Sequence, residues 1–357
     1  MTKNNRITYI DTLRVIAAIA VIVTHVSTIQ IDNLPYNSTN WHIHNIFAAL
    51  SRWCVPIFVM ISGALFLNSS KKLDIIRLYK KNVLRIIISL FVWSFIYAIF
   101  QYFTIEKYHN LSSIIGLTII GHYHFWFLYM ILGIYIAIPI YKAISINRAT
   151  LRYFLILAFI FVFFLPGIIQ LSSLFLPKQL GYILHNHLYF IETINFNYQH
   201  STPKIVMGYS FYFLLGHYIN TIEIKKNHLI YIIIGGITGF LYIAMFTFFF
   251  SDDHFFYQDF YHYLSIGTFL ETIAIFCIIK NTFNHSENCI TNRISTLSFG
   301  IYIIHPMIIE TILLLNINTY SVSSIISIPI IILSVYIISI IIIILLTKIP
   351  ILKQYCL

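Results

Sequence analysis

The stretch YIDTLRVIAAIAVIVTHV, residues 9–26, is an almost unbroken apolar run that carries three ionisable side chains, Asp11, Arg14 and His25. Its length predicts a membrane-spanning helix, because about 20 apolar residues cross the hydrocarbon core of a bilayer. A charge at membrane depth costs roughly 2.5–3.5 kcal/mol, so ionisable residues there usually serve a functional site. At about 100° per residue, the interval from Arg14 to His25 places both on one face, roughly 16 Å apart along the helix. Asp11 can pair with Arg14 one turn away.

The rest of the chain has the same membrane character. Of its 357 residues, 59% are hydrophobic and only 10% are charged, whereas soluble domains average about 25% charged residues. We therefore expect an all-α, polytopic membrane protein that forms one domain over residues 1–357, with a core at about 8–345. Apolar length predicts ten spans. They cover roughly residues 8–29, 44–67, 83–103, 123–143, 151–171, 205–220, 228–250, 263–280, 296–316 and 323–347.

The positions of the basic residues predict the orientation. Most of the 22 Lys and Arg residues fall in segments that are cytoplasmic if both termini are cytoplasmic, as the positive-inside rule requires. This distribution accounts for the formal net charge of +10 without a nucleic-acid partner. The four cysteines have no paired spacing, so we expect neither a disulfide framework nor a metal site.

One cytoplasmic segment, residues 71–85, is more basic than orientation requires. It carries a single acidic residue, Asp74, and six basic residues: Lys71, Lys72, Arg77, Lys80, Lys81 and Arg85. Contact with lipid phosphates is one interpretation, and a cytosolic ligand that bears phosphate groups is the other. On the opposite side, the long loop at 171–204 is rich in Asn, Tyr and His, and it can cover a site or bind a polar acceptor.

Other polar side chains in the predicted spans each have a structural interpretation beside a functional one. The Ser62-Gly63 pair can serve close helix packing, whereas His122 and Trp126 fit an interfacial aromatic belt. A buried histidine often hydrogen-bonds a neighbouring helix. The candidates for a site beyond the first helix are Arg52, Ser62, Gly63, His124, Trp126, Tyr302 and His305, while the roles of Glu271 and Glu310 stay open.

These residues suit an enzyme that moves a chemical group across the membrane. Such an enzyme needs a basic dock for a cytosolic donor, a polar path inward and a base near the acceptor, and segment 71–85, Arg14 and His25 offer them. Histidine suits the base because its ordinary pKa is about 6.5, and it can take a proton from a hydroxyl that attacks a thioester. Arg52 can then stabilise the developing oxyanion.

Four stretches resemble the signatures of the acyltransferase-3 family, integral membrane enzymes that O-acylate bacterial surface glycans. They are Asp11-Thr-Leu-Arg14 with His25, Arg52-Trp-Cys-Val-Pro-Ile-Phe-Val-Met-Ile-Ser62-Gly63, His124-Phe-Trp126-Phe127-Leu and Ser298-Phe-Gly-Ile-Tyr302-Ile-Ile-His305. The similarity runs from about residue 8 to 345. Within the family, the chain is most similar to the O-acetyltransferase of enterobacterial common antigen and to the intercellular-adhesin acyltransferases.

The resemblance implies a ten-helix protein of the bacterial cytoplasmic membrane that uses acetyl-CoA, or another acyl-CoA, as donor. It implies a surface glycan or a lipid-linked oligosaccharide as acceptor, with membrane lipids around the protein. Arg14 and His25 are implied to be essential. Arg52, Ser62 and Gly63 are implied motif positions, and the residues implied to line the core are His124, Trp126, Tyr302 and His305.

An exporter of a glycan or a small solute is the main alternative, because ten helices with buried charges also suit a transporter. Transporters often carry paired repeats and broken helices, and the two halves of this sequence show no pairing. The sequence leaves open the acceptor, the acyl group and the oligomeric state. It also leaves open whether His25 is a general base or an acyl carrier, and whether a separate partner completes the transfer.

Overall fold

A computed structural model describes residues 7–68, 73–105, 108–172, 207–253, 255–283 and 289–356. Within these ranges every regular element is a helix, which confirms the all-α prediction. The longer helices are α1 Thr8–Thr28, α2 Thr39–Ser51, α3 Cys54–Phe66, α5 Leu84–Thr104, α6 Leu111–Ile120, α7 Trp126–Ile136, α8 Ile138–Ile146, α9 Arg148–Phe159, α10 Leu165–Ser172, α13 Ser210–Thr221, α14 Lys226–Phe250, α15 Ile266–Thr282, α17 Ser298–Leu314 and α18 Ser324–Leu346. Shorter helices are α4 Ile75–Arg77, α16 Cys289–Ser295 and α19 Pro350–Tyr355, and π-helical turns occur at η2 Leu78–Val83 and η5 Ile160–Phe164.

The described helices make the chain a multi-pass membrane protein. Eight helical segments are long and apolar enough to cross a membrane, or nine if the bent pair α16 and α17 forms one span. The predicted span at 205–220 accounts for the difference from ten. Helix α13 has only 12 residues, and most of its side chains are buried within the bundle.

Two predicted spans are interrupted in the structure. The span at 44–67 consists of α2 and α3, which are separated at Arg52 and Trp53. Arg52 and Trp53 keep right-handed helical backbone angles, and the helical hydrogen bonds stop here because Pro56 has no N–H to donate to the carbonyl of Arg52. The Arg52 side chain at this interruption is only 8% exposed. The span predicted at 123–143 covers α7 and α8, but the segment long and apolar enough to cross a membrane is Leu111–Ile136, which joins α6 to α7.

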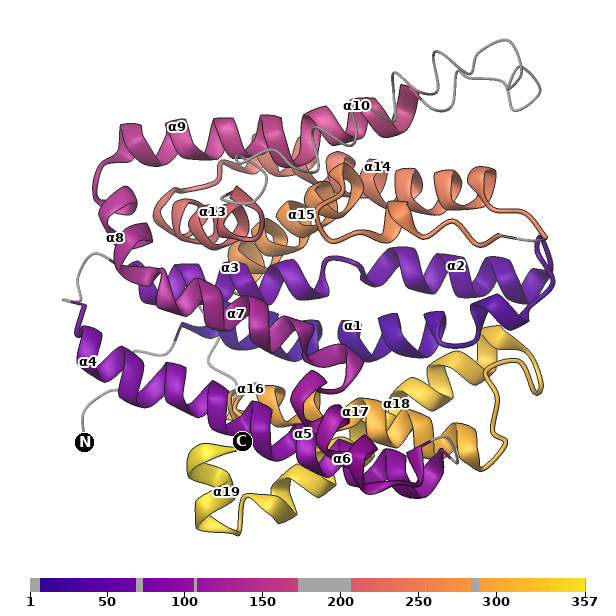
Figure 1. Ribbon diagram of the computed structural model, residues 1–357. Helices are drawn as coiled ribbons and strands as arrows, with labels where there is room; N and C mark the ends of the chain where they lie inside the picture. The colour runs from indigo at the N-terminus through magenta and orange to yellow at the C-terminus, as the bar shows by residue number, and fades with distance from the viewer. Residues whose placement is uncertain are drawn as a thin grey trace, which may run out of the picture.

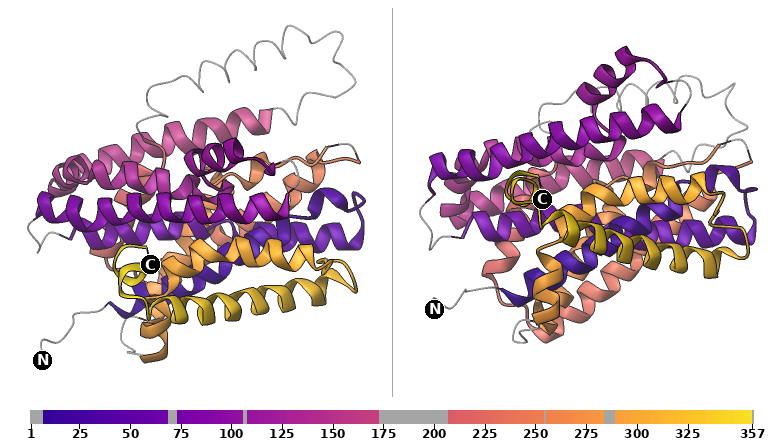
Figure 2. Two further views of the ribbon diagram at one scale, coloured as in Figure 1. Left: turned by 60° about the horizontal axis from the view of Figure 1, so that its bottom comes forward. Right: turned by 90° about the horizontal axis from the view of Figure 1, so that it is seen from below.

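Helix α1 lies at the centre of the bundle. It contacts α2, α3, α15, α16, α17 and α18, and Figure 1 shows it between the layer of α2 and α3 and the layer of α17 and α18. Its side chains Leu13, Ala17 and Ile22 are fully buried. Figure 2 shows the long helices running along one common direction, as expected for a membrane bundle. The helix that carries Arg14 and His25 is thus enclosed by protein along much of its length.

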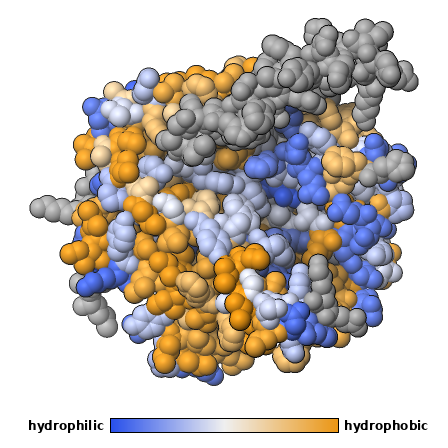
Figure 3. Space-filling model, viewed as in Figure 1, coloured by the Kyte–Doolittle hydropathy of each residue, from blue (hydrophilic) through white to orange (hydrophobic). Residues whose placement is uncertain are grey.

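The outer surface of the bundle is largely apolar. Large apolar side chains are exposed along α5, α14 and α18, including Phe103, Ile237 and Leu333. Figure 3 shows apolar residues over much of one face, with hydrophilic residues gathered toward the right-hand end of the view. Contiguous apolar surface of this extent is typical of a lipid-facing wall.

Helices α3 and α13 cross with their backbones in direct contact. A Cβ atom added to Gly63 would lie 1.7 Å from the backbone oxygen of Phe213, and one added to Gly216 would lie 2.1 Å from that of Met60. Small residues permit this close approach between membrane helices. The crossing fixes the position of α3 and, with it, of the neighbouring Ser62.

The Lys280 side chain caps the C-terminal end of α13. Its ammonium group donates to the backbone oxygens of Ile219, Asn220 and Ile222 at 2.7, 3.2 and 2.7 Å. Replacing Lys280 with methionine keeps the apolar stem but leaves these carbonyls unpaired. We expect a loss of about 2 kcal/mol in the free energy of unfolding, measured as a lower melting temperature of the detergent-solubilised protein. The exposed Lys353→Met variant is the control and should melt like the wild type.

Candidate functional site

A cavity of about 320 Å³ lies beside the N-terminal half of α1. Its volume falls in the range of small-molecule sites. Helices α1, α3, α5, α7, α16 and α17 contribute to its walls, so it joins segments from both ends of the sequence. Its polar lining residues are Arg14, Ser62, Asn82, Arg85, Tyr135, Ser295, Thr296, Ser298 and Tyr302.

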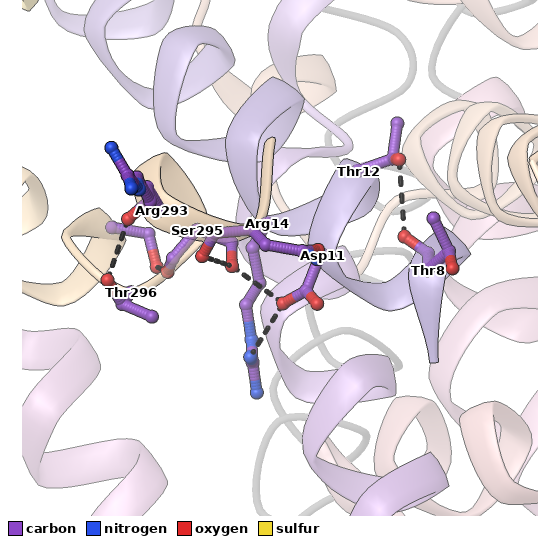
Figure 4. A network of polar contacts seen from close by, with 9 residues as sticks. Thr8, Asp11, Thr12, Arg14, Arg293, Ser295 and Thr296 are labelled. Atoms are coloured by element: carbon purple, nitrogen blue, oxygen red, sulfur yellow. Dashed lines mark hydrogen bonds and ion pairs between the residues drawn. The ribbon is translucent and has the colours of Figure 1, made fainter. Parts of the chain in front are cut away.

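Asp11 holds Arg14 at this cavity. A terminal nitrogen of Arg14 lies 3.4 Å from the Asp11 carboxylate, and the Ser295 hydroxyl donates to the same carboxylate oxygen at 2.6 Å. Figure 4 shows the Asp11 carboxylate joined by dashed lines to the guanidinium of Arg14, also on α1, and to Ser295 on α16. The Asp11 side chain is only 5% exposed, whereas the Arg14 side chain is 33% exposed. Asp11 is thus a buried anchor, and the Arg14 guanidinium can still reach an anionic ligand.

The bend between α16 and α17 faces the same cavity. The two helices meet at 62°, and Ser295, Thr296 and Ser298 from the bend line the cavity wall. The Ser298 hydroxyl donates to the backbone oxygen of Ser295 at 2.8 Å. The N-terminus of a helix carries partial positive charge, so the start of α17 favours an anion in the cavity near Arg14.

Arg85 brings the predicted basic segment into the site. Its guanidinium lies 5.4 Å from the ring centre of Phe299, and both residues line the cavity. Asn82, in the π-helical turn η2 that precedes α5, lines it as well. π-Helical turns occur frequently at functional sites. Among the other basic residues of segment 71–85, the side chains exposed near η2 are those of Arg77, Lys80 and Lys81. Lys71 and Lys72 lie outside the described residues.

Tyr302 connects the cavity to a cluster of histidines. Its side chain lines the cavity, and its hydroxyl donates to the backbone oxygen of His124 at 2.5 Å. The ring centre of Tyr302 lies 6.1 Å from that of His305, which lies 5.1 Å from that of His25. The structure therefore brings together four predicted site residues, His25, His124, Tyr302 and His305, from three separate stretches of the sequence.

His25 is the member of this cluster that is available for chemistry. It lies between His305 and Tyr123, whose ring centre is 5.6 Å away. Its side chain is partly exposed, and neither ring nitrogen is hydrogen-bonded to any residue that the structure describes. The described lining of the cavity includes Arg14 but not His25, so Tyr302 and His305 stand between them. A ligand has to pass or displace this layer to reach His25.

Arg52 and Trp126 lie outside the described cavity lining. Arg52 is 8% exposed at the break between α2 and α3, with its guanidinium 4.1 Å from the ring centre of Tyr261. Trp126 is stacked on Tyr263, with ring centres 5.5 Å apart. Roles for Arg52 and Trp126 in substrate contact stay predictions.

Ser62 and Gly63 face different surroundings. Ser62 lines the cavity, where its hydroxyl lies 3.3 Å from that of Tyr135. Gly63 faces the backbone of α13, which is the helix-packing interpretation of this pair. Substrate contact at Gly63 stays a prediction.

Several lining residues were not foreseen from the sequence. Asn82 and Tyr135 carry no recognisable motif, and Ser295 and Thr296 lie at the boundary of the predicted span at 296–316. The hydroxyl-rich run of 295–298 was the available signal, because serine and threonine at a helix start often mark a break. Among the described residues, no three His, Cys, Asp or Glu side chains are placed to hold a metal ion.

Residues 7–348 match a protein family described as an acyltransferase domain. The chain belongs to the acyltransferase-3 family. Among curated proteins, the chain is similar to the probable poly-beta-1,6-N-acetyl-D-glucosamine export proteins of Staphylococcus aureus strains MSSA476 and MW2. Each is 23% identical over 316 residues, which cover 84% of this chain and 81% of the relative. No solved structure matches the chain. The family match confirms the resemblance and a multi-pass membrane location, which is consistent with the bacterial cytoplasmic membrane.

Proposed function

We propose that the protein transfers an acetyl or other short acyl group from cytosolic acyl-CoA to a hydroxyl of a cell-surface or lipid-linked glycan. The arrangement that supports this most is a cavity with Arg14 at its wall and Tyr302 at its inner side, next to His305 and His25. The acyl group and the acceptor hydroxyl then meet at a histidine enclosed within the bundle.

The donor occupies the cavity in this proposal. Arg14 and Arg85 bind phosphate groups of the CoA, because guanidinium groups form strong, often bidentate hydrogen bonds with phosphates. The start of α17 adds favourable electrostatics. The apolar wall formed by Phe58 and Phe127 suits the pantetheine arm, which carries the thioester toward Tyr302.

The acceptor hydroxyl reaches His25 from the opposite side. His25 takes the hydroxyl proton while the oxygen attacks the thioester carbon. The new ester C–O bond forms, the C–S bond breaks, and the CoA thiolate leaves through the cavity. The buried Arg52 charge stabilises the oxyanion that develops on the thioester oxygen.

The Arg14→Ala and Arg85→Ala variants test the donor site. Each removes a charge-assisted contact worth about 1.5–3 kcal/mol, so we expect the KM for acetyl-CoA to rise about 10- to 100-fold. The measurement is release of CoA thiol by purified protein in the presence of an N-acetylglucosamine oligosaccharide. Arg152→Ala, at an exposed position of α9, is the control with an unchanged KM. Wild-type KM values in both site variants would refute the donor site.

Export of a polysaccharide is the second candidate, because the similar staphylococcal proteins are named as probable exporters of poly-beta-1,6-N-acetyl-D-glucosamine. The two functions predict different uses of acetyl-CoA. Purified protein with radiolabelled acetyl-CoA should transfer label to the oligosaccharide if it is an acyltransferase. A pure exporter would leave acetyl-CoA unused while moving the glycan.

A further inference from the structure

A second cavity, also of about 320 Å³, lies at the other end of α1 from the cavity that Arg14 lines. Its walls come from the segment after α1, the start of α2 and the segment after α14. In the view of Figure 1 these segments lie at the right, which is the end where Figure 3 shows hydrophilic residues. Ile31 in its wall follows His25 by six residues, about 9 Å at the helical rise. The cavity is therefore close to the base that the proposed function uses.

One part of the cavity wall is aromatic. The ring centres of Tyr36 and Trp41 lie 5.2 Å apart, and those of Trp41 and Phe256 lie 6.1 Å apart, both pairs edge to face. Trp41 is only 2% exposed, and its indole N–H has no hydrogen-bond partner among the described residues. A buried indole N–H usually has a partner. The wall thus offers a ligand both aromatic surface and an unpaired donor.

The rest of the wall is acidic. The exposed side chains of Asp32, Asp252 and Asp253 line it, and no Lys, Arg or His is among its described lining residues. The backbone N–H of Phe255 donates to an Asp252 carboxylate oxygen at 2.9 Å and holds this segment in a turn. Burial and the negative charges of Asp252 and Asp253 raise the pKa of the Tyr36 hydroxyl. This acidic cavity therefore attracts cations and repels the phosphate groups of acyl-CoA.

The lining suits a cationic sugar better than a metal ion. Among the residues that the structure describes, no three carboxylates are placed to hold a metal ion. An ammonium group is attracted both to carboxylates and to aromatic rings. A sugar adds a ring that can pack on the aromatic wall and hydroxyls that can bond the Trp41 N–H and the Gln258 amide. An amino sugar supplies all of these groups, whereas its N-acetylated form lacks the charge.

We propose that the acidic cavity binds an amino-sugar unit of the acceptor glycan, one that carries a free, protonated amino group. The ammonium group lies among the three aspartates, and the sugar ring packs against Trp41. The cavity holds the glycan in this way while a neighbouring unit presents its hydroxyl to His25. The inference rests on the proposed function, because it defines the chemistry of the acceptor. The preferred acceptor is then a glycan in which some amino groups are not acetylated.

Binding of tetrasaccharides to the purified protein tests this site without acyl transfer. Titration calorimetry near pH 6 keeps the aspartates ionised and a sugar amine with a pKa of about 8 protonated. We expect the glucosamine tetrasaccharide to bind at least about fivefold more tightly than the N-acetylglucosamine tetrasaccharide, since exposed ion pairs contribute up to about 1 kcal/mol each. The Asp32→Asn/Asp253→Asn double variant should lose this preference, because asparagine keeps the shape without the charge. Glu223→Gln, exposed beyond the opposite end of α14, is the control with wild-type binding.

Trp41→Phe tests the aromatic wall separately. Phenylalanine keeps an aromatic ring but removes the indole N–H, so both tetrasaccharides should bind about fivefold more weakly while the preference for glucosamine remains. Unchanged binding of both would refute the role of the indole.

The outcomes distinguish this inference from the proposed function. Equal affinities of the two tetrasaccharides for the wild type, or an unchanged preference in the double variant, would overturn the acidic cavity as an amino-sugar site. Ca²⁺ that binds through the same aspartates and is not displaced by the glucosamine tetrasaccharide would overturn it as well. A wild-type protein that prefers the glucosamine tetrasaccharide but transfers no acyl group would refute the proposed function alone. Acyl transfer without this preference would refute the amino-sugar site alone.

Discussion

Replacing His25 with alanine is expected to lower the kcat of acyl transfer by about 10²–10⁴-fold, the usual contribution of a positioned general base. The other rings are less suited to this role, because His305 Nε2 is fully buried and His124 uses both of its ring nitrogens in hydrogen bonds. The KM for acetyl-CoA should stay close to that of the wild type, since His25 is outside the described cavity lining. The measurement is transfer of radiolabelled acetyl to an N-acetylglucosamine oligosaccharide.

The control for His25 is His228→Ala, at an exposed position near the start of α14. It should retain wild-type kcat and KM. A wild-type kcat in His25→Ala would contradict the assignment of the base. An equal loss of kcat in His228→Ala would mean that the activity fell because the purified variants are damaged, and not because the base was removed.

Replacing Gly63 with valine is expected to prevent assembly of the bundle. Even its Cβ atom would overlap the Phe213 backbone oxygen at 1.7 Å, and backbone cannot rotate away as a flexible side chain can. We expect a loss of at least about 3 kcal/mol in the free energy of unfolding. The measurement is the yield of monodisperse protein in size-exclusion chromatography and its melting temperature.

Gly133→Ala is the matched control for this variant. Gly133 lies inside α7, and a Cβ atom there meets nothing within 4 Å. Alanine is also the better helix former by about 1 kcal/mol, so this variant should fold and melt like the wild type or slightly above it. A Gly63→Val protein with wild-type yield and melting temperature would refute the close crossing of α3 and α13.

The sequence predicted the features that depend on one helix. The apolar run of α1 predicted the span, and helical spacing predicted the contact of Asp11 with Arg14, which is confirmed. The family resemblance is confirmed as well. These predictions succeeded because apolar length, residue spacing and motif stretches are local properties of the chain.

Features that depend on contacts between several helices could not be predicted from the sequence. Composition does not locate the π-helical turn at η2, whereas Pro56 was an available signal for the break at Arg52. Helix α13 has only 12 residues, which is too few to span a bilayer, and most of its side chains pack inside the bundle. Its apolar side chains are therefore covered by protein and not by lipid. The contact of His122 with Glu310 joins distant segments, and no spacing rule connects them.

Sealed proteoliposomes test the central claim most directly. Radiolabelled acetyl-CoA, which does not cross the bilayer, is enclosed inside, and an N-acetylglucosamine oligosaccharide is added outside. The account predicts labelled oligosaccharide outside with wild-type protein and little or none with His25→Ala. With acetyl-CoA held near the wild-type KM, Arg14→Ala should label at least several-fold less than the wild type. Acetyl-CoA that stays intact in the wild-type vesicles, or equal labelling by the His25→Ala protein, would contradict it.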